Sequence, residues 1–213
     1  MISIQKIIKK IGKIKNLTQM LEYNAKINKN KIFLVYENYS ITFGQTYDLV
    51  NNCCNYLLSK NLKRQNIVSI VLKNSIEFVI VYFACIKLNL RLNPLPYYLS
   101  PNSIKMSISF LKPKLVVTDY FMSEKIGGKF YYIRFENFEN FKKEINISKK
   151  FIIKTKNNVK DVAMLYYSSG TTGKPKLIEQ SVSKKLVDGL IILGTDEQQI
   201  QFKTVCFSVQ TTH

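Results

Sequence analysis

The sequence predicts an α/β fold with a mostly parallel sheet flanked by helices. Short apolar runs of strand length alternate with longer segments whose apolar residues recur at helical spacing, which is the pattern of parallel α/β proteins. The chain has 213 residues and 46% hydrophobic residues. That is enough for one sizeable domain with its own core.

Helical spacing and start signals predict the helices. Ser100 suits a cap and Pro101 suits the first position of a helix. Glu77 lies near the start of another predicted helix, where a carboxylate complements the helix dipole. The predicted helices cover residues 1–26, as one or two helices with a break at Gly12, then 46–58, 74–87, a segment opening at Ser100, and 181–193.

Apolar runs predict the strands, and two of them form a hairpin across Glu37 and Asn38. The polar, Lys- and Asn-rich residues 136–160 are expected to be a surface connection. The predicted strands are 31–36 and 39–43 in the hairpin, then 67–72, 90–95, 114–118, 130–133, 162–167 and 204–209.

The composition limits the classes of partner. The 32 basic and 14 acidic residues give a net charge of +18, which raises the hypothesis of nucleic-acid binding. The lysines are spread along the chain without a dense block, so this hypothesis rests on net charge alone, and we expect no specific nucleic-acid partner. None of the four cysteines forms a Cys-x-x-Cys pair, so we expect free thiols and a cytoplasmic protein.

The N-terminal segment has isoleucines at helical spacing with lysines between them, but no uninterrupted apolar core typical of a secretory signal. The longest apolar run, 78–86, is too short to span a bilayer. A basic amphipathic helix of this kind suits an anionic membrane surface. We favour the alternative that the helix packs its apolar stripe against the domain.

One stretch carries the chemistry. Its small, hydroxylated and glycine residues follow an apolar run, and glycine lets backbone N–H groups converge on an anion. It is not the Walker loop, whose glycines are further apart and whose lysine precedes Ser or Thr. The stretch reads Tyr166-Tyr167-Ser168-Ser169-Gly170-Thr171-Thr172-Gly173-Lys174-Pro175-Lys176.

This stretch resembles the phosphate-loop signature of the AMP-forming adenylating enzymes, which include acyl-CoA synthetases, 4-coumarate–CoA ligases, luciferases and peptide-synthetase adenylation domains. The match runs through Lys176 and then departs at Leu177, where the family usually has Gly. Four further segments also resemble the family. Residues 41–43 resemble one of its early signatures, and residues 74–78 resemble the start of one of its helices. Residues 86–94 resemble a segment that ends in proline, and residues 209–213 resemble one that ends in histidine.

The resemblance implies the N-terminal part of the family's large domain, with residues 1–213 a partial AMP-binding domain and the C-terminal lid domain absent. It implies that ATP activates a small-molecule carboxylic acid to an acyl-adenylate, and that coenzyme A or a carrier-protein phosphopantetheine then accepts the acyl group. His213 would contact the substrate, and the variable Lys174 would be solvated. The phosphate ligands would be Ser168, Ser169, Gly170, Thr171, Thr172, Gly173 and Lys176.

The family's magnesium-linked glutamate, ribose-binding aspartate and catalytic lysine belong to segments that would follow His213. We therefore expect residues 1–213 alone not to form acyl-CoA. The leading interpretation is the N-terminal portion of an AMP-dependent acid–thiol ligase, and the acid it uses stays open. The alternative is a degenerate, non-catalytic nucleotide-binding remnant, for which Leu177, Val182 and Gln210 are the arguments.

Overall fold

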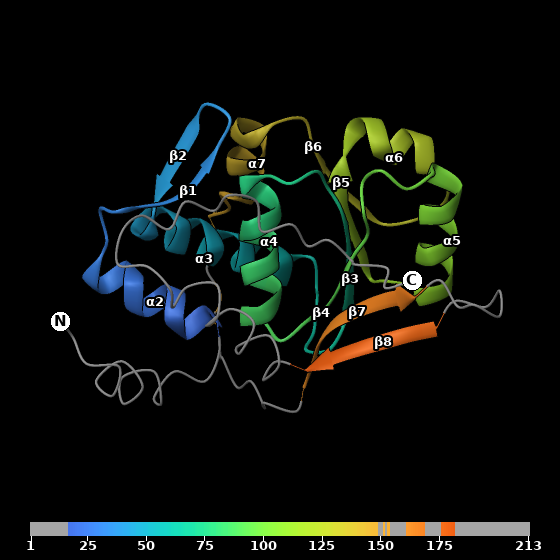
Figure 1. Ribbon diagram of the computed structural model, residues 1–213, viewed down its shortest axis with the longest axis horizontal. Coiled ribbons are helices and arrows are strands. Elements are labelled where there is room, and N and C mark those ends of the chain that lie inside the picture. The colour runs from blue at the N-terminus through green and yellow to red at the C-terminus, as the bar shows by residue number, and fades with distance from the viewer. Residues whose placement is uncertain (1–16, 149–150, 152, 154–160, 169–175, 182–213) are drawn as a thin grey trace.

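The computed structural model describes residues 17–148, 151, 153, 161–168 and 176–181 (Figure 1). Within them, a two-stranded hairpin and a six-stranded sheet are combined with helices. The helices are α2 (Leu17–Ile27), α3 (Phe43–Ser59), α4 (Ile76–Lys87), α5 (Pro101–Leu111), α6 (Tyr120–Ile126) and α7 (Phe138–Ile145). The strands are β1 (Ile32–Tyr36), β2 (Tyr39–Thr42), β3 (Ile67–Val71), β4 (Arg91–Pro94), β5 (Leu115–Asp119), β6 (Tyr132–Phe135), β7 (Val162–Ser168) and β8 (Lys176–Ser181).

The main sheet has the strand order β6-β5-β3-β4-β7-β8. All neighbours from β6 to β7 are parallel, and β8 is antiparallel to β7. The carboxyl ends of the parallel strands therefore meet at one edge of the sheet. In open α/β sheets this is the edge that binds ligands.

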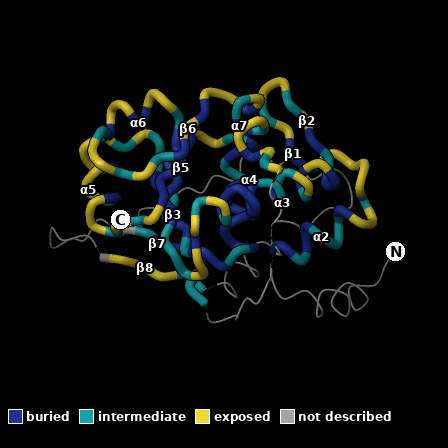
Figure 2. Tube along the Cα trace, turned by 180° about the vertical axis from the view of Figure 1, so that it is seen from behind, coloured by how far each residue is buried: buried dark blue, intermediate teal, exposed yellow. Residues whose placement is uncertain are grey.

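The core occupies both faces of this sheet, as the side chains of a strand alternate between them. Val117 and Ile133 pack in the larger cluster with α3, α4 and α7, whereas Val116 faces a smaller cluster under α5 and α6. Figure 1 shows these two groups of helices on opposite sides of the sheet. In Figure 2 the buried residues concentrate in α4 and the central strands.

Side-chain caps explain where the helices begin. Thr42 accepts a hydrogen bond from the N–H of Gln45 and forms a capping box with it, so α3 begins at Phe43, before the predicted start at 46. Ser75 caps α4, and Ser100 caps α5 with Pro101 at its first turn. These two starts are confirmed.

Two predicted details are wrong, and two elements were not predicted. Residues 136–160 are not only a surface connection, because α7 lies within them and buries Phe138, Phe141 and Ile145. Strand β6 begins two residues after the predicted start at 130, and helix α6, which Asp119 caps, was not expected. The segment after the glycine-rich stretch forms strand β8, which was also not expected. Predicted elements in 1–16 and 182–213 lie outside the described residues.

The cysteines of α3 and α4 are free and buried, as predicted: Cys53, Cys54 and Cys85. Burial raises the pKa of all three thiols, that of Cys54 to about 12. Cys206 lies outside the described residues. In the part of the chain that the structure describes, no helix is both long and apolar enough to cross a membrane.

Candidate functional site at the carboxyl edge of the sheet

Strand β7 leads into the glycine-rich stretch and β8 leads out of it. The two strands are antiparallel, with Tyr167 opposite Leu177 and Ser168 opposite Lys176. The first and last predicted phosphate ligands are therefore brought together at the carboxyl edge of the sheet. The other predicted ligands, Ser169, Gly170, Thr171, Thr172 and Gly173, lie outside the described residues, as does His213.

A polar cluster holds the amino end of β7. Arg64 donates two hydrogen bonds to the carboxylate of Asp161, at 2.7 and 2.6 Å, and Asn89 donates a third at 2.6 Å. Gln65 donates to the side chain of Asn89 at 3.0 Å and to the carbonyl of Val162 at 3.3 Å. Because the carboxylate accepts from an Arg and an Asn at once, this end of the strand is fixed to the turn before β3 and to the end of α4.

A second polar chain reaches the other half of β7. Ser69 of β3 donates to Asn93 of β4 at 3.0 Å, and Asn93 donates to the carbonyl of Leu165 at 3.0 Å. Ser69 and Asn93 have no exposed surface. Buried polar groups of this kind are costly unless paired, and here each has a partner. The strand that leads into the stretch is thus attached to the sheet by side chains at two levels.

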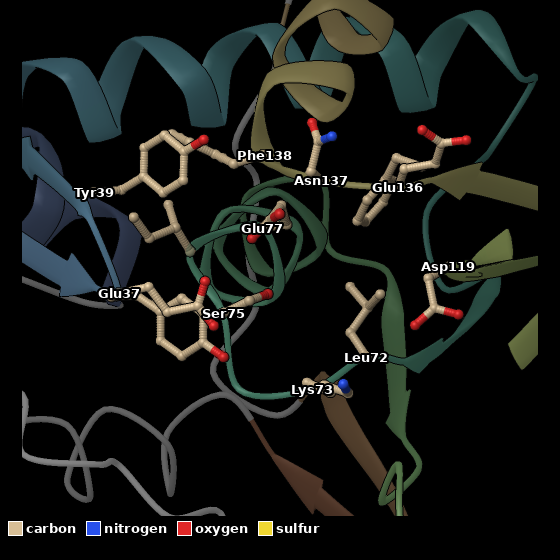
Figure 3. Close-up of a pocket in the computed structure, with 13 residues that line it drawn as sticks. Glu37, Tyr39, Leu72, Lys73, Ser75, Glu77, Asp119, Glu136, Asn137 and Phe138 are labelled. Atoms are coloured by element: carbon tan, nitrogen blue, oxygen red, sulfur yellow. The ribbon is translucent and has the colours of Figure 1, made fainter. Parts of the chain in front are cut away.

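A pocket of about 220 Å³ opens at the same edge, beside β3, β5 and β6 (Figure 3). Figure 3 shows Glu37 and Tyr39 from the β1–β2 hairpin on one side, Asp119 and Leu72 on the other, and Glu77 between them. The complete lining is Tyr36, Glu37, Tyr39, Leu72, Lys73, Ser75, Ile76, Glu77, Asp119, Phe135, Glu136, Asn137 and Phe138.

The pocket is acidic, with four carboxylates and one lysine in its lining. Glu77, 8% exposed, lies in the first turn of α4, as predicted, a position where a carboxylate complements the helix dipole. Asp119 accepts a hydrogen bond from the N–H of Met122 at 2.6 Å. Burial, together with the hydrogen bond to Asp119, raises the pKa of Tyr97 to about 12. These negative charges disfavour a polyphosphate, so the β7–β8 side of the edge is the better place for one.

Metal ligands do not cluster in the part of the chain that is described. No group of three or more His, Cys, Asp and Glu residues there could hold a metal ion. The carboxylates of the pocket come from separate segments, and Asp119 already caps α6. The described residues therefore contain no preformed cluster of three or more such ligands.

Comparison with known proteins identifies the family. A family model described as "AMP-binding enzyme" matches residues 21–207. The chain belongs to this family. The predicted resemblance to adenylating enzymes is therefore confirmed.

Relatives of this AMP-binding chain include CoA ligases and antibiotic-named synthases. It is 26% identical over 182 residues to the 2-succinylbenzoate–CoA ligase of Bacillus licheniformis, covering 83% of this chain and 37% of the ligase. It is 25% identical over 201 residues to bacitracin synthase 3 of Bacillus licheniformis, covering 91% of this chain and 3% of the synthase. The chain thus spans well under half of the length of either relative.

Solved structures confirm the fold class of this AMP-binding chain. O-succinylbenzoate coenzyme A synthetase from Bacillus subtilis, in complex with ATP and magnesium ion, is similar with a TM-score of 0.70 and 21% identity. That match covers 84% of this chain and 48% of the synthetase. VinN is similar with a TM-score of 0.74 and 16% identity, over 84% of this chain and 47% of VinN. At these identities the likeness shows the fold alone, a parallel-rich sheet flanked by helices.

Sequence reasoning found the motif and its place after a strand, but missed the β7–β8 hairpin, the acidic pocket and the role of Asn93. The available signal for Asn93 was its neighbour Pro94. A proline inside a predicted strand has no N–H to donate to the sheet, so a nearby side chain has to supply that hydrogen bond. The pocket had no comparable signal, since its carboxylates are far apart in the sequence.

Proposed function

We propose that this chain is the N-terminal, phosphate-binding part of an AMP-dependent acid–thiol ligase. Such an enzyme uses ATP to activate a carboxylic acid as an acyl-adenylate before a thioester forms. The observation that carries the proposal is the phosphate-loop sequence 166–176, in which Ser168 pairs with Lys176 at the carboxyl edge of the sheet. Membership of the AMP-binding family supports it.

The glycine-rich stretch would bind the β- and γ-phosphates of ATP. When the acid's carboxylate oxygen attacks the α-phosphorus, the bond to the bridging oxygen breaks and charge gathers on the departing pyrophosphate. Backbone N–H groups, hydroxyls and a lysine placed around that charge would lower the barrier. Lys176 would supply the positive charge, with donors from Ser168, Ser169, Gly170, Thr171, Thr172 and Gly173.

The proposed cofactors and partners follow from the relatives. One similar synthetase is solved with ATP and magnesium ion, and we propose both for this protein. The described residues contain no cluster of three or more metal-ligating side chains, and we assign none of them as a ligand of the ion. The acceptor would be coenzyme A or a carrier-protein phosphopantetheine, because CoA ligases and peptide synthases both occur among the relatives.

We further propose that residues 1–213 form part of the family's AMP-binding domain and that His213 contacts the substrate. The three described thiols are free, which supports a cytoplasmic location. No specific nucleic-acid or membrane partner is part of this proposal.

Carboxylate-dependent exchange of labelled pyrophosphate into ATP tests the proposal. The protein made from the complete gene is assayed with a panel of fatty, aromatic and amino acids and with 2-succinylbenzoate. The proposal predicts exchange with one class of acid above the acid-free rate, and loss of exchange in the Lys176→Ala variant. Binding of Mg·ATP without exchange for any acid in the panel would contradict a ligase.

A further inference from the structure

We infer that Asn93, oriented by Ser69, is a positioning residue for the phosphate-binding strand, because its side chain replaces a hydrogen bond that the backbone cannot make. The inference rests on the proposed function only for its effect on nucleotide binding. Its structural part concerns strands β3, β4 and β7, all within the described residues.

The direction of the N–H groups along β4 is set by its bonds to β3. Arg91 donates its N–H to Asn66 at 3.0 Å, and Leu95 donates to Ile70 at 2.8 Å. The register between β3 and β4 is regular from Ile67–Arg91 to Ile70–Pro94. Because successive N–H groups on a strand point to opposite sides, the nitrogens of residues 92 and 94 face β7.

Residue 94 is a proline, so it has no N–H to donate. The pair between β4 and β7 is Leu92–Met164. From that pair, the regular parallel pattern aims the nitrogen of residue 94 at the carbonyl of Leu165. Leu165 has no exposed surface, so water cannot take the missing donor's place, and an unpaired carbonyl there would be costly.

The side chain of Asn93 supplies the donor. Its amide nitrogen lies 3.0 Å from the carbonyl oxygen of Leu165. Ser69, its Cα partner on β3, donates to the amide oxygen at 3.0 Å. Because the carbonyl of Leu165 can only accept, the amide nitrogen must face β7, and the Ser69 hydroxyl holds the oxygen at the other end of the amide. The two bonds together connect three neighbouring strands through the dry interior of the sheet.

The hydrogen bond from Asn93 to Leu165 matters for the candidate phosphate site, because it holds the strand that leads into the glycine-rich stretch. Leu165 lies shortly before Ser168, and it is also opposite Glu179 of β8. Loss of the Asn93 bond would let the carboxyl half of β7 separate from β4 and carry β8 with it. Catalytic and binding groups must be held within fractions of an ångström, so such a shift would weaken phosphate binding.

The test compares four variants of the full chain. Asn93→Leu removes the amide at similar volume, and Ser69→Ala removes only its orienting bond. The double variant Asn93→Leu with Pro94→Ala restores a backbone N–H at residue 94. Thr118→Val is the matched control, because Thr118 also has no exposed surface and donates to a strand carbonyl, that of Val71 at 2.9 Å, on the far side of β3 from β7.

Hydrogen exchange and calorimetry with Mg·ATP are the two measurements. Asn93→Leu should speed amide exchange in β7 and β8 and weaken Mg·ATP binding about tenfold. Ser69→Ala should act in the same direction but less strongly. The double variant should recover most of both losses. Thr118→Val should lower the melting temperature while it leaves Mg·ATP affinity and β7 exchange unchanged.

Two outcomes would overturn the inference. One is β7 exchange in Asn93→Leu equal to that in the wild type; the other is no recovery in the double variant. If Asn93→Leu does not fold, Ser69→Ala alone decides, and unchanged exchange in β7 would overturn the inference. Absence of Mg·ATP binding by the wild type would count against the proposed function, while the exchange comparison would still decide whether Asn93 positions β7.

Discussion

Ser168 and Lys176 face each other as Cα partners in the antiparallel pair of β7 and β8. Paired residues on antiparallel strands lie roughly 5 Å apart, so the two ends of the stretch 169–175 start from neighbouring points. Ser168 ends β7, the neighbour of β4 in the sheet, so the pair lies toward the edge where the parallel strands end. This serine and this lysine, both assigned to phosphate binding, thus flank residues 169–175 in the chain.

Replacing the lysine of this pair tests the phosphate assignment. Lys176→Ala should raise the dissociation constant of Mg·ATP at least about tenfold, because it removes a full positive charge from the β- and γ-phosphates. Lys174→Ala is the control, since that lysine is expected to be solvated and should change the constant by less than about twofold. Calorimetry measures both. Equal effects of the two substitutions would show that only the general basic charge matters.

The cluster at the amino end of β7 should contribute to stability. Asp161→Ala leaves the donors of Arg64 and Asn89 without their acceptor, so the free energy of unfolding should fall by about 1–3 kcal/mol. Glu22→Ala removes an exposed i,i+4 pair with Lys26 and should cost less than about 1 kcal/mol. Urea unfolding monitored by circular dichroism gives both values. Similar costs for the two would mean that the Asp161 cluster is no stronger than a surface pair.

Helix α7 should prove to be part of the core. Phe141 is 2% exposed, and Phe141→Ala should lower the free energy of unfolding by about 3–5 kcal/mol. Phe121 of α6 is 58% exposed, so Phe121→Ala should cost less than about 1 kcal/mol. The comparison uses the same urea titrations. If Phe141→Ala lowers the free energy of unfolding only slightly, α7 is not part of the core and residues 136–160 are a surface connection.

The buried thiols predict a loss of stability in alkali. Burial raises the pKa of Cys54 from 9.0 to about 12 in the folded state, whereas the unfolded thiol ionises near its ordinary value. Above that ordinary value the unfolded state loses its proton first, so the free energy of unfolding falls as the pH rises from about 9 towards 12.

The change that tests this is Cys54→Ala in a Cys206→Ser background. It should reduce the alkaline slope of stability by up to about 1.4 kcal/mol per pH unit. Urea unfolding at several pH values between neutral and about 10.5 measures the slope. Parallel curves for the parent and Cys54→Ala would contradict the assignment of a raised pKa to this thiol.

The sequence predicts the elements from β3 to β5 well because each carries a local signal. The strands are short apolar runs, and Ser75 and Ser100 cap the helices that follow. Helix α7 was missed because lysines and asparagines surround it, although Phe138, Phe141 and Ile145 recur at helical spacing behind the cap Asn137. Its helical character depends on tertiary packing against α3 and β6, which local composition does not encode.

For the candidate site, the sequence indicates a chemistry but not a geometry. The types and order of residues 166–176 predict a phosphate-binding stretch. The pairing of Ser168 with Lys176 depends on β8, whose sequence Lys-Leu-Ile-Glu-Gln-Ser has few strong strand formers. The bond from Asn93 to Leu165 joins residues 72 positions apart, so it is visible only once β4 and β7 are placed side by side.

Calorimetric titration of Mg·ATP into the full chain shows whether the residues between β7 and β8 hold the nucleotide's phosphates. We predict saturable binding near one equivalent, competition by pyrophosphate, and loss of affinity in Lys176→Ala but not in Lys174→Ala. The absence of saturable binding, or binding that pyrophosphate does not displace, would contradict the claim that the residues between β7 and β8 hold the phosphates of ATP.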